Sequence, residues 1–345
     1  DAVDDQIVAD LTAGYRPQGT DFLVNTTTEL DGAFGDLSAV SPSIAALPDV
    51  GFVIVWSDSA VDSSGEYFAA AIRGQRYSAN GAPMGDEILV ASITNAPVHS
   101  LTGPSVAALS GGGFVVAFRS NVSTSNDDIR AVRYDENGAP VGNSFKVNTT
   151  SSGYQAWPEI VGLVDGGFAI TWVDGSQIGD DVSISAIRAQ QFDANGNALG
   201  DEFLVNSTTA NGQSEPSISS LSDGGFVIAW TDSSQTGGDV SNRAIRAQRF
   251  DAAGAAVGDE FLVNSTTTGG QSQPSVSHLS DGGFVVTWTD ESQTGFDVSN
   301  SAIRAQRYGP DGTPLGLELL VNSTSANAQN SPNAAALSGG GFIIS

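Results

Sequence analysis

The sequence predicts an all-β protein, a six-bladed β-propeller of four-stranded antiparallel blades. A segment of about 58 residues recurs along the 345-residue chain. Its anchor is a Gly-Phe step at Phe52, Phe114, Phe168, Phe226, Phe284 and Phe342. Each copy carries short runs of Val, Ile and Phe between Gly, Ser, Thr and Asn, which is typical of strands joined by tight turns. Tandem copies of this length are typical of propeller blades.

The copy that begins at Gln273 shows the four expected strands in order, at 274–280, 283–290, 302–308 and 318–322. Asp-Gly-Gly between the first two strands and turns such as 193–196 between the last two are hairpin signals, so each copy is an antiparallel meander. The first strand opens with proline, which an edge strand tolerates. The second strand is apolar on both faces, as expected for a strand covered by neighbouring blades.

The ends of the chain predict how the ring closes. The last copy stops after its second strand, whereas segments 6–11 and 20–25 at the start of the chain match a third and a fourth strand. We therefore predict a single domain, 1–345, whose closing blade is shared by residues 1–25 and 331–345. The alternative is an open array or a β-solenoid of the same repeats.

Composition and charge exclude several classes of function. The formal net charge is −26, which opposes binding to nucleic acid or to an anionic membrane. The chain contains no cysteine, so neither a disulfide framework nor a thiolate metal site can form. No apolar run is long enough to predict a membrane helix.

The loops between the second and third strands carry a recurring pair of aspartates in the pattern DxSQTGxDVS. Oxygen-rich loops can coordinate calcium, so these aspartates are candidate Ca²⁺ ligands. They are Asp174, Asp181, Asp232, Asp239, Asp290 and Asp297. The alternative is structural: the first aspartate caps a bend or pairs with an arginine of the third strand, where nine of the thirteen cations lie.

No catalytic residues are assigned. On the first strands, which would line a central channel, only Glu159 and His278 depart from a small or apolar pattern, and His99 lies in a loop. A lone histidine is more often a locally satisfied group than a base. Nothing resembling a nucleophile elbow is present.

Aromatic residues that break the repeat pattern are the candidates for ligand binding, because exposed rings stack on sugars or anchor protein partners. They are Tyr67, Phe68, Tyr154, Trp157 and Phe296. The alternative is local packing between blades. The Asn-Ser-Thr and Asn-Thr-Thr sequences at the ends of fourth strands, such as 206–208, are primarily turn signals.

The consensus DGGFVVTWTD…SAIRAQRYD…GDEFLVNST…QSQPSVS resembles repeats of large secreted bacterial proteins of the hemolysin-type calcium-binding (RTX) group. This resemblance implies an extracellular or cell-surface location, calcium-rich surroundings and neighbouring domains of a larger secreted chain. The chain departs from that group because it has no glycine-rich calcium nonapeptides. Segment 280–288 also loosely resembles the Asp-box of sialidases, without their arginine triad.

Together these features predict a non-enzymatic extracellular propeller that binds a glycan or a cell-surface protein and is stabilised by calcium. The alternative is a glycoside hydrolase or lyase that acts on polysaccharides, with carboxylates from different blades at the mouth of the channel.

Overall fold

The computed structural model describes residues 24, 38–48, 51–61, 67–94, 100–123, 126–239, 241–295, 300–323, 327–337 and 340–345. In these ranges all regular structure is β. The strands form five four-stranded antiparallel sheets and one two-stranded sheet, which confirms the all-β class. No helix of the described residues is long and apolar enough to cross a membrane.

Each sheet is one copy of the repeat. Blade one contains β1 (Ser38–Leu47), β2 (Gly51–Val61), β3 (Tyr67–Tyr77) and β4 (Ile88–Thr94). Blade two contains β5 (Ser100–Ala108), β6 (Phe114–Ser123), β7 (Asn126–Tyr134) and β8 (Phe145–Lys146). Blade three contains β9 (Gln155–Gly162), β10 (Phe168–Asp174), β11 (Ala186–Phe192) and β12 (Ala198–Leu204).

Blade four contains β13 (Gln213–Ser220), β14 (Phe226–Asp232), β15 (Ala244–Phe250) and β16 (Ala256–Leu262). Blade five contains β17 (Gln271–His278), β18 (Phe284–Asp290), β19 (Ala302–Tyr308) and β20 (Pro314–Leu320). The sixth, partial blade is the hairpin of β21 (Ala334–Ala336) and β22 (Phe342–Ile344). In every sheet the strands pair in chain order, so the predicted meander is confirmed.

The turn between the first two strands forms for the reason that the sequence suggests. In blade five the Asp281 carboxylate accepts a hydrogen bond from the Gly283 N–H, and Gly282 adopts a left-handed φ of 87°. A Cβ atom on Gly283 would lie 2.2 Å from the Tyr308 carbonyl oxygen. Glycine is therefore required at this position by the close approach of the third strand.

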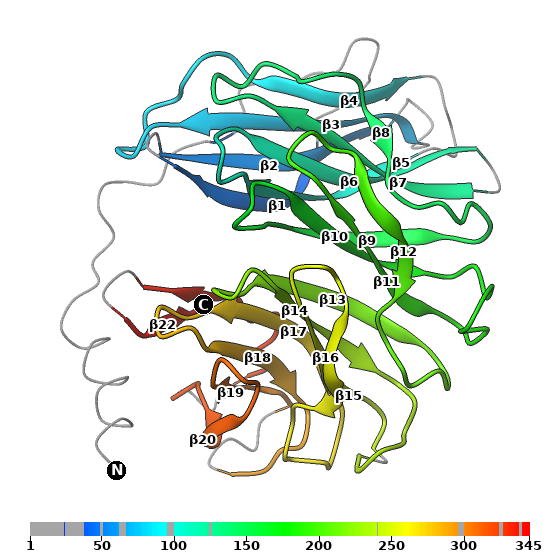
Figure 1. Ribbon diagram of the computed structural model, residues 1–345, viewed down its shortest axis with the longest axis vertical. Helices are drawn as coiled ribbons and strands as arrows, with labels where there is room; N and C mark the ends of the chain where they lie inside the picture. The colour runs from blue at the N-terminus through cyan, green and yellow to red at the C-terminus, as the bar shows by residue number, and fades with distance from the viewer. Residues whose placement is uncertain are drawn as a thin grey trace.

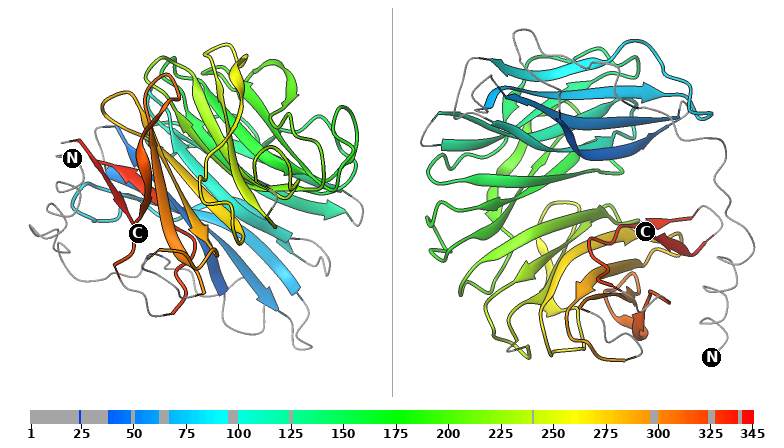
Figure 2. Two further views of the ribbon diagram at one scale, coloured as in Figure 1. Left: turned by 90° about the horizontal axis from the view of Figure 1, so that it is seen from below. Right: turned by 180° about the vertical axis from the view of Figure 1, so that it is seen from behind.

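The first strand of each blade lies next to the first strand of the following blade, so these strands form the inner layer. Figure 1 shows β1 and β17 toward the middle of the molecule and β4 and β20 at its outer edges. The blades follow one another in chain order in the views of Figure 2 as well. Serine hydroxyls connect neighbouring inner strands: Ser43 Oγ accepts from Val106 N–H at 3.2 Å, and Ser217 Oγ accepts from Val276 N–H at 3.0 Å.

The core lies between the blades. Trp172, Trp230 and Trp288 of the second strands are fully buried. One apolar cluster joins Ala169 and Val173 of blade three to Phe226 and other residues of blade four. Both faces of the second strand are thus covered, as predicted, which buries much apolar surface and holds the blades in a fixed order.

The segments expected to complete the partial blade, 6–11 and 20–25, lie outside the described residues except for Val24. The Val24 carbonyl accepts a hydrogen bond from Tyr77 Oη at 3.0 Å. Val263, at the end of the fourth strand of blade four, accepts from Tyr308 Oη of blade five at 3.3 Å. Val24 therefore contacts blade one in the way that the last strand of a preceding blade does.

Candidate functional site

The first aspartate of each loop pair is buried and bound to arginine. Asp174 is 2% exposed, and its Oδ2 accepts from Arg188 Nε at 2.6 Å. Its Oδ1 accepts from the Ser176 backbone N–H at 2.9 Å and from Gln155 Nε2 at 2.6 Å. Asp232 and Asp290 make the same bonds to Arg246 and Arg304. The structural alternative, in which this aspartate caps a bend and pairs with arginine, is therefore observed.

The second aspartate is also buried, and it holds the end of the fourth strand. Asp181 Oδ2 accepts from Asn206 Nδ2 at 2.8 Å, and Asp239 Oδ2 accepts from Asn264 Nδ2 at 2.7 Å. Asn206 and Asn264 are each only 1% exposed, so these Asn-Ser-Thr sequences act as structural turns, as expected. Asp297 lies outside the described residues.

These bonds leave the loop carboxylates engaged with protein donors. No three His, Asp or Glu side chains of the described ranges gather as ligands of a metal ion would. Calcium binding by these loops stays a prediction.

A glutamate of the fourth strand is a second carboxylate partner of this arginine, and the sequence analysis missed its role. Arg246 donates from Nη1 to Glu260 Oε1 at 3.0 Å. Glu260 Oε2 also accepts from the backbone N–H of Ser207 in blade three at 2.7 Å. The recurrence of Glu in the GDEFLVN motif is the signal that could have found it. Because this set of Arg, Asp and Glu recurs from blade to blade, its role is to stabilise the blades rather than to bind a ligand.

Trp157 breaks the repeat at the inner layer. It lies on β9 directly before Pro158, has a left-handed φ of 50° and is 56% exposed. The residue before the strand proline is left-handed in every blade: Ser41, Gly103, Trp157, Glu215, Gln273 and Ser331. A bulky side chain in this conformation is strained, and strain of this kind persists where packing or function maintains it. Trp157 is the only aromatic ring in the series.

Tyr154, just before β9, is 37% exposed and rests on the backbone of Gly175. A Cβ atom on Gly175 would lie 2.1 Å from the Tyr154 ring. In blade four Gly212 is the equivalent of Tyr154, and Ser233 is the equivalent of Gly175. The large ring of blade three therefore occurs together with a glycine at the position that it covers. Tyr154 therefore packs locally and still presents one edge to solvent. The Tyr67, Phe68 and Phe296 side chains lie outside the described part of the chain.

Glu159, two residues after Trp157 on the same strand, is the second departure from the repeat. The equivalent residues of the other complete blades are serines, among them Ser105 and Ser217. The Glu159 Oε2 atom accepts from Ser105 Oγ of blade two at 3.0 Å. Burial raises the pKa of the Glu159 carboxyl to about 7, although the Ser105 hydrogen bond opposes this shift. Such a carboxyl is partly protonated near neutral pH and can donate as well as accept a hydrogen bond.

Other titratable groups on the inner strands do not join Glu159. Glu215 Oε2 accepts from Thr231 Oγ1 and from the Gln273 N–H, and Gln273 makes the same two kinds of bond in blade five. Glu215 therefore has a structural role, in which it links the inner strands of blades four and five. His278 ends β17, at the end of its blade nearer the first turn, and its Nε2 atom has no hydrogen-bond partner among the described residues. His99 lies outside those residues.

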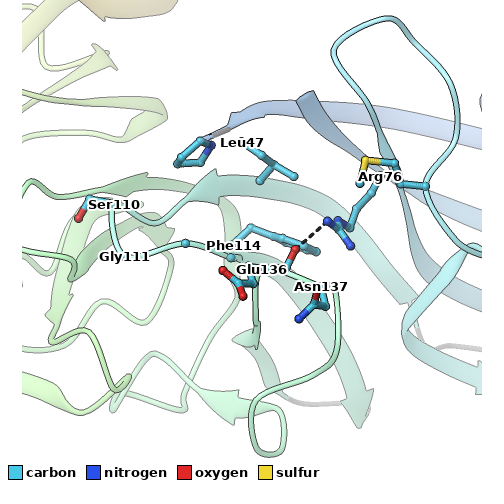
Figure 3. A pocket seen from close by; sticks show the side chains of 11 residues that line it. Leu47, Arg76, Ser110, Gly111, Phe114, Glu136 and Asn137 are labelled. Atoms are coloured by element: carbon cyan, nitrogen blue, oxygen red, sulfur yellow. Dashed lines mark hydrogen bonds between the residues drawn. The ribbon is translucent and has the colours of Figure 1, made fainter. Parts of the chain in front are cut away.

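A separate hollow of about 360 Å³ lies between blades one and two, at the opposite end of the strands from Trp157 (Figure 3). Arg76 forms one wall, and its Nη2 donates to the Glu136 carbonyl at 2.7 Å. The other wall is the turn 110–113, where Gly111 takes the place of Asp165, Asp223 and Asp281 in the other blades.

Comparison with known proteins gives a fold and no family. No family model matches the chain, and no curated protein matches it. The resemblance to RTX proteins is therefore not supported by a family match. Solved structures do match over most of the chain.

An α-L-arabinanase from Penicillium chrysogenum complexed with arabinobiose is 12% identical, with 87% of this chain and 85% of that chain covered at a TM-score of 0.53. A protein of unknown function from Dyadobacter fermentans is 11% identical, with 87% of both chains covered at 0.52. A Hadza microbial sialidase is 11% identical, with 86% and 61% covered at 0.52. The chain is a β-propeller. At these identities the likeness establishes the fold alone.

Proposed function

We propose that the chain is a carbohydrate-binding β-propeller whose site lies on β9, at the end of the inner layer where Trp157 is exposed. The observation that carries this proposal is the exposed, left-handed Trp157 at a position that is small or polar in every other blade. An indole ring offers a flat apolar face on which a sugar ring can stack. An extracellular location, with a surface glycan as the partner, belongs to the same proposal.

Glu159 supports this site because it adds a polar group two residues along the same strand. Its partly protonated carboxyl can donate to or accept from a sugar hydroxyl. The fold likeness supports carbohydrate as the ligand class. It favours the hydrolase considered below over a binding module, since the matching propellers include an arabinanase complexed with arabinobiose and a sialidase.

The test is a glycan array probed with the wild-type chain and with Trp157→Gly. Glycine adopts a φ of 50° without strain, so this variant should keep its melting temperature while losing the glycan signal. Gly103, the equivalent residue in blade two, shows that the blade accepts glycine there. Equal signals from the two proteins would contradict the proposal.

The second candidate is a glycoside hydrolase, which the raised pKa of Glu159 favours because a protonated carboxyl can act as a general acid. We expect the release of reducing sugar from any glycan that binds on the array, with activity falling as the pH rises through about 7. Glu159→Gln should abolish this release and keep binding. Binding of the same glycan without release leaves the chain a binding module.

A further inference from the structure

An arginine on the third strand is held between two carboxylates in four of the five complete blades. In blade four Arg246 contacts Asp232 at 2.7 Å and Glu260 at 3.0 Å. Arg73, Arg188 and Arg304 have equivalent Asp and Glu partners. These blades show what surrounds the guanidinium when the repeat is intact.

Blade two breaks this rule at both carboxylates. Ser120 replaces the aspartate and Ser144 replaces the glutamate. The arginine itself, Arg130, remains: its Nε donates to Ser144 Oγ at 2.8 Å and its Nη2 donates to the Ser144 carbonyl at 3.1 Å. Within the described residues no carboxylate forms an ion pair with Arg130.

Arg130 is also more accessible than three of its four counterparts. It is partly exposed, as Arg73 is, whereas Arg188, Arg246 and Arg304 are 9%, 5% and 8% exposed. A ligand can therefore reach the guanidinium in blade two from solvent, while in the other blades protein carboxylates enclose it.

The surroundings of Arg130 favour an anion in a chain that is otherwise strongly acidic. On the neighbouring strands Arg119 pairs with Asp127, and Lys146, the only lysine, pairs with Asp128 at 2.9 Å. With Arg130 this makes three cations against two carboxylates. In blade three Arg188 pairs with both Asp174 and Glu202, so one cation meets two carboxylates there.

We propose that Arg130, which lies in the middle of β7 of blade two between β6 and β8 (labelled in Figure 1), binds the carboxylate of a ligand. The ligand carboxylate takes the place that the aspartate and the glutamate occupy in the other blades. A guanidinium presents a planar fork of N–H donors that fits a carboxylate and pairs with it strongly where water is partly excluded. This site lies on other strands than Trp157, so it does not depend on the proposed glycan site.

The experiment is calorimetric titration with sodium glucuronate, with glucose as the neutral match and sodium sulfate as the second anion, all at one ionic strength. We expect glucuronate to bind, and glucose and sulfate to bind at least about tenfold more weakly. Equal binding of glucose, or of sulfate, would overturn the assignment of a carboxylate site.

Two variants locate the site. Arg130→Gln removes the guanidinium and should weaken glucuronate binding about tenfold or more. Ser144→Glu restores the carboxylate of the other blades, so it should raise the melting temperature and also abolish glucuronate binding. Because Ser144→Glu is expected to be more stable than the wild type, its loss of binding cannot arise from unfolding. Unchanged glucuronate affinity in this folded variant would overturn the proposal.

Discussion

Single residues in this protein are best understood by comparing them with their counterparts in the other blades. Arg246 is 5% exposed and its partners Asp232 and Glu260 are almost fully buried, so three charges share one site inside the protein. Removing one member of such a set leaves the others without compensation. Residues that recur at this position stabilise the blades. Trp157 and Glu159 depart from their counterparts, and Arg130 lacks the carboxylate partners of its counterparts, so these three are candidates for function.

Arg246→Ala should lower the free energy of unfolding by about 3–5 kcal/mol, because two buried carboxylates lose their cation. The matched control is Arg133→Ala, since the Arg133 guanidinium bonds only backbone carbonyls of the next blade at an exposed site. That change should cost no more than about 1 kcal/mol. Denaturant unfolding measures both, and equal losses would show that the buried charge set is not a special source of stability.

Glu159 predicts a pH dependence of stability. Its pKa rises from 4.5 in the unfolded chain to about 7 in the folded one, so the folded state holds the proton more tightly. The stabilisation is therefore complete below about pH 4.5 and is lost as the pH rises through about 7. Glu159→Ser, which restores the residue of the other blades, should flatten the melting temperature over this window. A wild-type slope that persists in the variant would assign the effect to another group.

At the scale of elements, the hairpin between the first two strands sets the geometry of each blade. Gly283 lies where the backbone of the third strand passes. Gly258 instead lies in the fourth strand, β16, where its pairing with β15 shifts register, at a left-handed φ of 74° with no atom within 4 Å of its would-be Cβ. The two glycines are therefore required for different reasons: one by close packing and the other by backbone conformation.

Substituting alanine separates these two requirements. Gly258→Ala should cost about 1 kcal/mol, the strain of a left-handed alanine. Gly283→Ala should cost more than about 2 kcal/mol, because the strand that carries the Tyr308 carbonyl has to move. Denaturant unfolding measures the loss of stability in the two variants. A larger loss for Gly258→Ala than for Gly283→Ala would contradict the roles given to these two glycines.

At the scale of the whole molecule, the incomplete sixth blade leaves apolar surface on its neighbour. Ile44 on β1 is 64% exposed, whereas its counterparts Val106, Ile160 and Val276 are 6–7% exposed because the preceding inner strand covers them. Phe342 and Ile344 on β22 are only half-buried, although the second strands of blades three to five are fully buried. They pack against Leu279 and Val285 of blade five, so their exposure reflects the missing outer strands of the partial blade.

Deletion of residues 1–25 should therefore lower the melting temperature markedly and broaden the transition, since the closing blade would lose its third and fourth strands. Calorimetry measures both quantities. A variant that replaces Trp157 with glycine serves as the control, because it leaves the closing blade intact. An unchanged melting temperature after the deletion would contradict closure by the N-terminal strands.

The repeat and its turns could be predicted from the sequence because they depend on local chemistry. Glycine, proline and aspartate at constant spacing specify hairpins, and apolar residues on both faces of the second strand predict burial from two sides. The candidate site was predicted only in part. Trp157 was chosen as an aromatic exception and Glu159 was noted as a departure, but the contact of Glu159 with Ser105 of blade two depends on the packing of adjacent blades.

The sequence by itself determined the number of repeats, the four strands of each blade and the acidic balance, because these follow from composition and from residues close together in the chain. Only the tertiary structure decided what the charged groups do. The paired loop aspartates of blade three contact Arg188 and Asn206, and Glu202 connects that blade to the one before it. These partners are 14 to 53 residues apart, and only the folded chain brings them within hydrogen-bonding distance.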